Sequence, residues 1–227
     1  MNIQYTLVTG RLALKRVTPV IQALFGEYHL RDLTATAPKA FFLLRPDGDR
    51  PTWDTFLSRL VDAAKANGLI LDSNSAVTID AVVSAFARHL GNTSAPAHAI
   101  AYDREPDLIA LYDIAIHLND GHDLAVLACQ TSRTFDSPNP LPAGGCYWFL
   151  SRDVRLHGDS YDAIHLAAKM FHALNVDDPD ELVEVIVEET TRVVDTIVYP
   201  EVRPLIALRV AQRLHKLSLE ALQTEPA

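Results

Sequence analysis

The residues best suited to chemistry lie close together near the middle of the chain: Asp113, His117, Asp120 and His122. Asp113 and His117 are four residues apart on a predicted helix, so their side chains share one face. Asp120 continues that stripe, and His122 follows Gly121, a residue that lets the chain turn back. Carboxylate and imidazole groups at this spacing could hold a divalent metal ion that activates water. The cluster therefore raises one functional hypothesis, a metal-dependent hydrolase.

A plainer interpretation of the same residues is favoured. A polar stripe is typical of the solvent-facing side of an amphipathic helix, and short His/Asp patterns often occur by chance. The sequence also lacks the common signatures of P-loop and dinucleotide binding, zinc proteases, serine hydrolases and CxxC redox proteins. We therefore expect no cofactor and favour a protein without catalytic activity.

The chain has two cysteines, Cys129 and Cys146. Two cysteines cannot form a disulfide framework, and neither has a neighbouring cation that would activate its thiol, so we expect small buried side chains. Residues 1–6 lack the basic and apolar pattern of a signal peptide, and no apolar run approaches the roughly 18 residues of a membrane span. These features predict a cytoplasmic protein with no membrane partner.

The apolar patterns and turn signals along the 227 residues predict an α+β fold. We expect small mixed or antiparallel sheets with flanking helices, and a C-terminal antiparallel helical hairpin. Strands are expected near 3–8, 41–45, 97–102, 124–130, 146–150 and 153–157. Helices are expected near 52–67, 78–90, 106–119 and 160–174, and one more is expected to start at Thr18-Pro19. The small and polar residues 92–96 suggest a linker between an N-terminal α+β domain, 1–91, and a C-terminal α+β domain, 97–227.

The predicted hairpin covers residues 178–222. Asp178 can cap a helix, Pro179 suits the first helical position, and Glu181 completes the start signal. Valines are frequent in the stretch that follows, but the cap favours helix over strand. Pro200 breaks this helix, and a second one is expected from about 204 to 222. Its apolar residues are spaced by three and four, as in a coiled-coil seam: Ala207, Val210, Leu214, Leu217 and Ala221.

Opposite charges on the two predicted helices support the hairpin. Residues 177–201 carry nine acidic side chains and one basic one, whereas residues 203–216 carry four basic side chains and no acidic ones. Folding about position 198 or 199 would place three pairs level with one another: Glu181 with Lys216, Glu184 with Arg213, and Glu188 with Arg209. Such pairs would fix the register of the hairpin, and the same complementarity could operate between two chains in a homodimer.

The favoured function is a non-catalytic interaction protein that binds another protein or protein complex. The formal net charge of −9 disfavours direct nucleic-acid binding. A sharper version is an inhibitor or regulator whose carboxylates occupy the basic surface of a nucleic-acid-binding complex. The acidic segment and the aromatic residues beside a Pro/Gly-rich loop supply the candidate contact residues: Glu184, Glu188, Glu189, Asp195, Leu141 and Trp148.

Overall fold

The structure, a computed structural model, describes residues 4–32, 40–45, 51–70, 78–92, 102–135, 144–176 and 178–224. The chain forms two compact units, residues 1–150 and residues 151–227. Apart from Asn92, the expected linker 92–96 lies outside the described residues, as does the expected strand near 97–102 except for Tyr102. The division of the chain at that linker stays a prediction.

An antiparallel sheet forms the frame of the first unit. Its strands are β1 (Gln4–Ala13), β2 (Arg31–Asp32), β3 (Ala40–Arg45), β4 (Val126–Phe135) and β5 (Cys146–Ser151), in the order β2-β3-β1-β4-β5. β1 pairs antiparallel with both β3 and β4, and its pairing with β4 runs from Gln4 opposite Phe135 to Ala13 opposite Val126. This sheet and the helices confirm the predicted α+β class.

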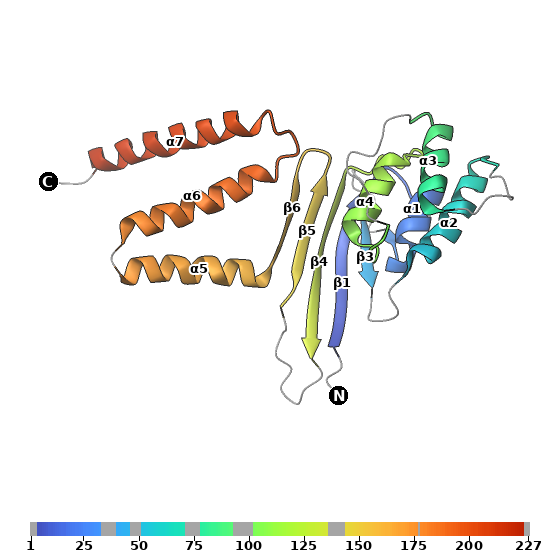
Figure 1. Cartoon of the computed structure of the whole chain (residues 1–227), viewed down its shortest axis with the longest axis horizontal. Helices are drawn as coiled ribbons and strands as arrows, with labels where there is room; N and C mark the ends of the chain where they lie inside the picture. The colour runs from blue at the N-terminus through green and yellow to red at the C-terminus, as the bar shows by residue number, and fades with distance from the viewer. Residues whose placement is uncertain are drawn as a thin grey trace. The chain divides into compact units, whose positions relative to one another are not determined.

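Side chains alternate across β1 and β4, so one face of the sheet is covered and the other is not. Leu12 on β1 and Leu127 and Cys129 on β4 are buried, whereas Arg11 and Gln130 are exposed. Such alternation is expected of an antiparallel sheet with a single packed face. In Figure 1 the helices of this unit lie to one side of β1 and β4.

Four helices lie on the buried side of the sheet: α1 (Pro19–Phe25), α2 (Trp53–Ala66), α3 (Ile79–His89) and α4 (Leu108–His117). α2 packs against α1, and α3 packs against α2. A short 3-10 turn, η1 (Gly26–Tyr28), follows α1. The predicted caps at Thr18 and Thr78 are confirmed, since each hydroxyl accepts a hydrogen bond from the third backbone N–H after it. The helix expected at 106 begins at Leu108, because the Asp107 carboxylate caps it by accepting from the Ala110 N–H at 2.7 Å.

Large apolar side chains from all four helices meet in one core. Five of these side chains are fully buried: Phe25 on α1, Phe56 on α2, Phe86 on α3, and Leu111 and Tyr112 on α4. Each such side chain contributes roughly 1.5–3 kcal/mol on burial. The core therefore fixes α4, and with it the predicted Asp/His cluster, against the sheet.

The second unit consists of β6 (Arg155–Asp159) and three helices, α5 (Ser160–Asn175), α6 (Pro179–Asp195) and α7 (Arg203–Thr224). Asp159 caps α5 in a capping box with Asp162, and Asp178 caps α6 by accepting from two backbone N–H groups. The predicted C-terminal antiparallel helical hairpin is confirmed in α6 and α7. The capping signal thus outweighed the strand preference of the valines in α6.

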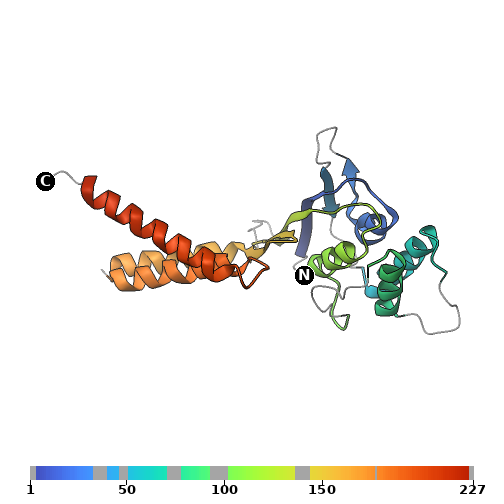
Figure 2. The same cartoon turned by 90° about the horizontal axis from the view of Figure 1, so that it is seen from above.

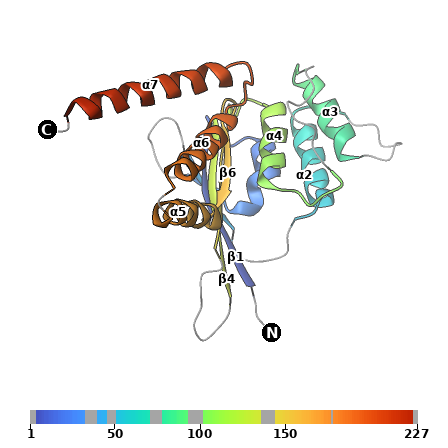
Figure 3. The same ribbon diagram turned by 60° about the vertical axis from the view of Figure 1, so that its left-hand side comes forward.

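The three C-terminal helices pack as adjacent pairs, α5 with α6 and α6 with α7. α5 and α6 run side by side, whereas α7 leaves the turn and diverges from α6 (Figures 2 and 3). Ile206 and Val210 near the start of α7 are half-buried, and every described side chain from Ala211 onward is exposed. α7 therefore packs on α6 only near the turn. None of the helices within the described ranges is both long and apolar enough to span a bilayer.

Candidate functional site

Three residues of the predicted Asp/His cluster, Asp113, His117 and His122, are buried, and Asp120 is half-buried. Asp113 and His117 on α4 are only 8% and 7% exposed, so the expectation of a wet polar stripe was wrong. α4 carries apolar residues on nearly every side and packs against α1, so its polar residues are covered as well. The side-chain amide of Asn92 contacts His117 twice, at 3.3 Å from Nδ1 and 3.0 Å from the backbone oxygen. Burial lowers the pKa of His117 below its usual value.

His122 is fully buried and both of its ring nitrogens have backbone partners. Nδ1 accepts a hydrogen bond from the Leu124 N–H at 2.9 Å, and Nε2 lies 3.0 Å from the Ala115 carbonyl oxygen. This arrangement fits a neutral ring with its proton on Nε2. Burial lowers the pKa of His122, against the opposing effect of the nearby Asp120 and Asp123 carboxylates. Neither nitrogen points to an open coordination position.

Asp120 forms hydrogen bonds with residues at the start of α1. Its Oδ1 accepts from the Thr18 hydroxyl at 2.5 Å and its Oδ2 accepts from the Val20 N–H at 3.2 Å. Within the described ranges, no three His, Cys, Asp or Glu side chains are arranged to hold a metal ion. The geometry thus gives no support to the metal-dependent hydrolase, because His117, Asp120 and His122 form hydrogen bonds within the first unit instead.

The two cysteines and Trp148 lie on the sheet. Cys129 is buried, and burial raises the pKa of its thiol to about 12, which makes it a poor nucleophile. Cys146 is half-buried and unpaired with Cys129. Trp148, predicted to contact a partner, is half-buried against the core, while its neighbours Tyr147 and Phe149 are exposed. The predicted contact residue Leu141 lies outside the described residues.

The predicted acidic contact residues lie on α6, and three of the four have partners within the second unit. Glu188 accepts from the Lys169 ammonium of α5 at 2.9 Å. The Arg192 guanidinium binds Glu189 at 2.6 Å and holds the pKa of that carboxyl below its usual range. Asp195 lies 3.6 Å from Arg203 at the turn into α7. Glu184, in contrast, is exposed on α6.

Two of the three charge pairs expected to set the register of the hairpin, Glu184 with Arg213 and Glu188 with Arg209, do not form among the described residues. Glu188 binds Lys169 of α5 instead of Arg209, and across the described residues neither Glu184 nor Arg213 takes part in an ion pair. The reason is geometric, because α7 departs from α6 beyond the turn. Asp195 with Arg203 joins the two helices close to that turn.

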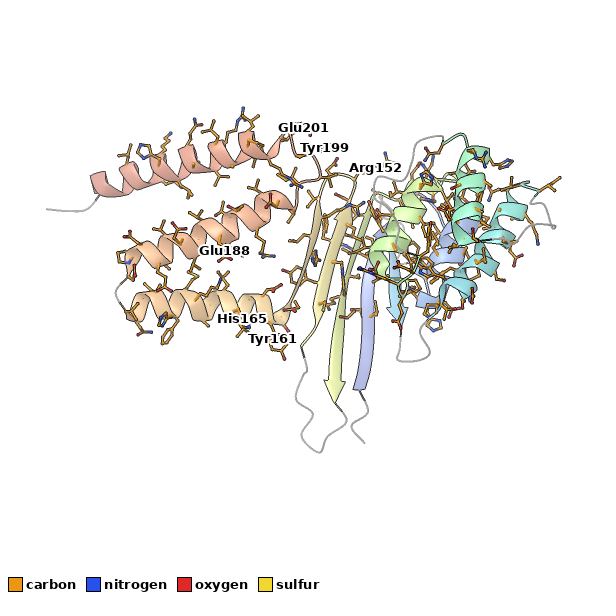
Figure 4. The ribbon with its side chains drawn as sticks, in the orientation of Figure 1. Arg152, Tyr161, His165, Glu188, Tyr199 and Glu201 are labelled. Carbon is orange, nitrogen blue, oxygen red and sulfur yellow. The ribbon has the colours of Figure 1, made fainter. Side chains whose placement is uncertain are left out.

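A charged groove of about 200 Å³ runs between α5 and α6. Asp162 and His165 of α5 line it together with the Lys169–Glu188 and Arg192–Glu189 pairs. Figure 4 labels His165 on α5 and Glu188 on the facing side of α6. At the other end of α6, the Tyr199 hydroxyl donates to Asp153 at 3.0 Å, and this bond raises the pKa of Tyr199. The Lys169–Glu188, Arg192–Glu189 and Tyr199–Asp153 contacts lie at sites open to solvent.

The most prominent feature of the second unit is its uncovered apolar surface, which the sequence patterns did not predict. Only Ala173, Val185 and Val194 are buried there among the described apolar residues. Exposed large apolar side chains occur on all three helices: Tyr161, Ile164, Phe171, Leu174, Val183, Ile186, Val187, Val193, Leu205, Leu208, Leu214 and Leu217. One signal could have identified this surface. α6 carries valine and isoleucine on more than one face, which exceeds what a single hairpin seam can bury.

No protein family model, curated protein or solved structure matches this chain. The side chains described above are therefore the basis for inferring its function.

Proposed function

We propose that this protein is a non-catalytic acidic interaction protein that binds another protein through the helices α5, α6 and α7. One observation carries the proposal, the apolar surface of the second unit. Phe171 is 70% exposed, and Ile186 and Val187 are about half exposed on the middle helix. Exposed large apolar side chains occur on all three helices, and large apolar patches on soluble proteins are typical of interaction sites. A helical unit with so few buried side chains gains stability when a partner covers it.

The charge of α6 favours a partner with a basic surface. Glu184 is exposed beside Val183 and Val187, so one partner could contact both apolar and acidic groups. Carboxylates directed at a basic surface speed encounter and make affinity fall as salt rises. A nucleic-acid-binding complex offers such a surface, and the protein would act on it as an inhibitor or regulator.

The existing ion pairs of α6 do not prevent this role. Glu188 and Asp195 pair with Lys169 and Arg203 at sites open to solvent. Exposed pairs of this type contribute only about 0–1 kcal/mol, so the carboxylates can exchange partners at little cost. The unpaired thiols of Cys129 and Cys146 are consistent with a reducing compartment, and we place the protein in the cytoplasm.

Capture from the native host tests this function. The full tagged chain is expected to retain one specific protein or complex at low salt and to release it as salt rises. Glu184→Lys combined with Glu188→Lys should weaken capture at least about tenfold, and Ile186→Ser should do the same without a charge change. Asp62→Lys combined with Asp103→Lys is the matched control, because it makes the same charge change on the first unit.

The control variant should capture the partner as the unmodified chain does. Equal capture by the unmodified chain, the α6 charge variant and Ile186→Ser would contradict the proposal. Circular dichroism of each variant should give the same helix content, which separates loss of binding from loss of folding.

A further inference from the structure

The apolar stripe of α7 is only partly covered by its own chain. Ile206 and Val210 begin the stripe and are half-buried near the turn. Leu214 and Leu217 continue it at the same helical spacing, yet they are 51% and 44% exposed. The second half of α7 therefore presents to solvent the same kind of surface that its first half packs on α6.

α6 has a matching surface toward its N-terminal end. Val183, Ile186 and Val187 are exposed there, away from the buried Val185 that packs toward α5. α7 diverges from α6 (Figures 2 and 3), and these side chains stay exposed. The structure thus contains two uncovered apolar stripes, one on each helix of the hairpin.

The charges beside the two stripes are opposite in sign. Glu184 lies beside Val183 on α6, and Arg213 lies beside Leu214 on α7, both of them exposed. Two α7 helices laid against each other would bring Arg209 and Arg213 near their own copies, which costs free energy. α7 laid against α6 instead brings guanidinium to carboxylate. Charge complementarity therefore selects an α6–α7 contact over an α7–α7 contact.

We propose that a second copy of this chain occupies this surface, with α7 of each copy lying antiparallel along α6 of the other. The arrangement has two-fold symmetry, so the same contact forms twice and closes into a dimer. Aligning Arg213 with Glu184 of the other copy also brings Leu214 level with Val183, so the apolar and charged contacts share one register. The inference rests on the proposed interaction function of α5–α7 and names one partner for that surface.

Light scattering coupled to size-exclusion chromatography on the purified full chain tests the dimer. We expect a mass that rises to twice that of one chain as the concentration increases through the micromolar range. Glu184→Lys and Arg213→Glu each place like charges in both contacts, so each should raise the dissociation constant at least about tenfold. Asp103→Lys, which changes charge on the first unit, is the matched control and should dimerise normally.

Mixing the two weakened variants separates contacts between chains from contacts within one chain. A mixed dimer of Glu184→Lys with Arg213→Glu pairs opposite charges in both contacts, so mixing should restore the dimer mass. Pairing inside one chain cannot be rescued in this way, because each variant keeps its own like-charge pair. Restoration supports the inference, and its failure overturns it.

A chain that stays monomeric at every concentration would also overturn the inference. Capture of a different protein that depends on Ile186 would still stand in that case, because it is measured separately. If neither a dimer nor capture is observed, both the inference and the proposed function fail.

Discussion

Asp120 accepts a hydrogen bond from the hydroxyl of Thr18, a residue 102 positions earlier in the chain. The second oxygen of the same carboxylate accepts from the Val20 N–H, in the first turn of α1. A carboxylate at this position satisfies a free backbone donor and interacts favourably with the helix dipole. Asp120 thus joins the turn after α4 to the start of α1.

Replacing Asp120 with alanine should destabilise the first unit. The change leaves the Thr18 hydroxyl and the Val20 N–H without their acceptor, and we expect a loss of about 1–2 kcal/mol in the free energy of unfolding. Urea denaturation followed by circular dichroism measures it. Asp103→Ala, at an exposed position, is the control and should stay within about 0.5 kcal/mol. Unchanged stability in Asp120→Ala would show that this capping contact contributes nothing.

His122 should make stability depend on pH. Its pKa is lower in the folded chain than the ordinary value of 6.5, chiefly because it is buried. Between the folded and unfolded pKa values the unfolded chain binds more protons, so stability falls as the pH drops below about 6.5. The slope contributed by one such group reaches at most about 1.4 kcal/mol per pH unit. Denaturation at neutral and mildly acidic pH should give this slope, with His117 contributing in the same direction.

The variant His122→Gln tests whether His122 causes this pH dependence of stability. His122→Gln should lower stability at neutral pH, because the Leu124 N–H loses its acceptor, and should make the pH dependence shallower. Equal slopes in the unmodified chain and His122→Gln would refute the assignment.

Local signals in the sequence were sufficient to predict where α1, α3 and α6 begin. Thr18, Thr78 and Asp178 each accept hydrogen bonds from backbone N–H groups of the following turn, as their residue types indicated. A cap depends on residues within one turn, so its signal is complete in a short stretch of sequence. The burial of Asp113 and His117 depends instead on which element packs against α4, and spacing along one helix contains no such information.

The charge pattern of the hairpin illustrates the same limit at longer range. The pattern matched Glu184 with Arg213 by position, and the fold does contain the antiparallel helices that this match requires. Position along two helices does not fix the angle between them. α7 diverges from α6 (Figures 2 and 3), and Arg213 is exposed. The pairing of Glu188 with Lys169 could not be predicted either, because a charge pattern along two helices does not show that a third helix, α5, packs against α6.

The two cysteines should differ in reactivity. Cys129 is buried on β4 with a thiol pKa of about 12, whereas Cys146 is half-buried at the start of β5. A disulfide reagent such as Ellman's reagent should modify about one thiol quickly in the folded chain and both in denaturant. Cys146→Ser should abolish the fast reaction, and Cys129→Ser should preserve it. Rapid modification of Cys129 in the folded Cys146→Ser variant would contradict the buried position.

Two adjacent residues of α6 allow packing within the chain to be separated from binding to a partner. Val185 is buried and lines the contact with α5, whereas Ile186, the next residue, is 45% exposed. Val185→Ala removes buried methyl groups and should cost about 1–2 kcal/mol of stability in the α5–α6 pair. Ile186→Ala removes more atoms, yet it should cost less than about 0.5 kcal/mol, because solvent already reaches them.

Amide hydrogen exchange resolved over α5 and α6 measures the loss of stability in Val185→Ala, since a loss of about 1.4 kcal/mol speeds exchange about tenfold. Partner capture and dimer mass measure the association of Ile186→Ala. This variant should weaken partner capture, dimer formation or both, while hydrogen exchange in the free chain stays unchanged. If hydrogen exchange in Val185→Ala is as slow as in the unmodified chain, and Ile186→Ala associates normally, then the two faces of α6 have been assigned incorrectly. The opposite result, a stability defect confined to Val185 and a binding defect confined to Ile186, follows only if one face of α6 packs on α5 and another face contacts a partner.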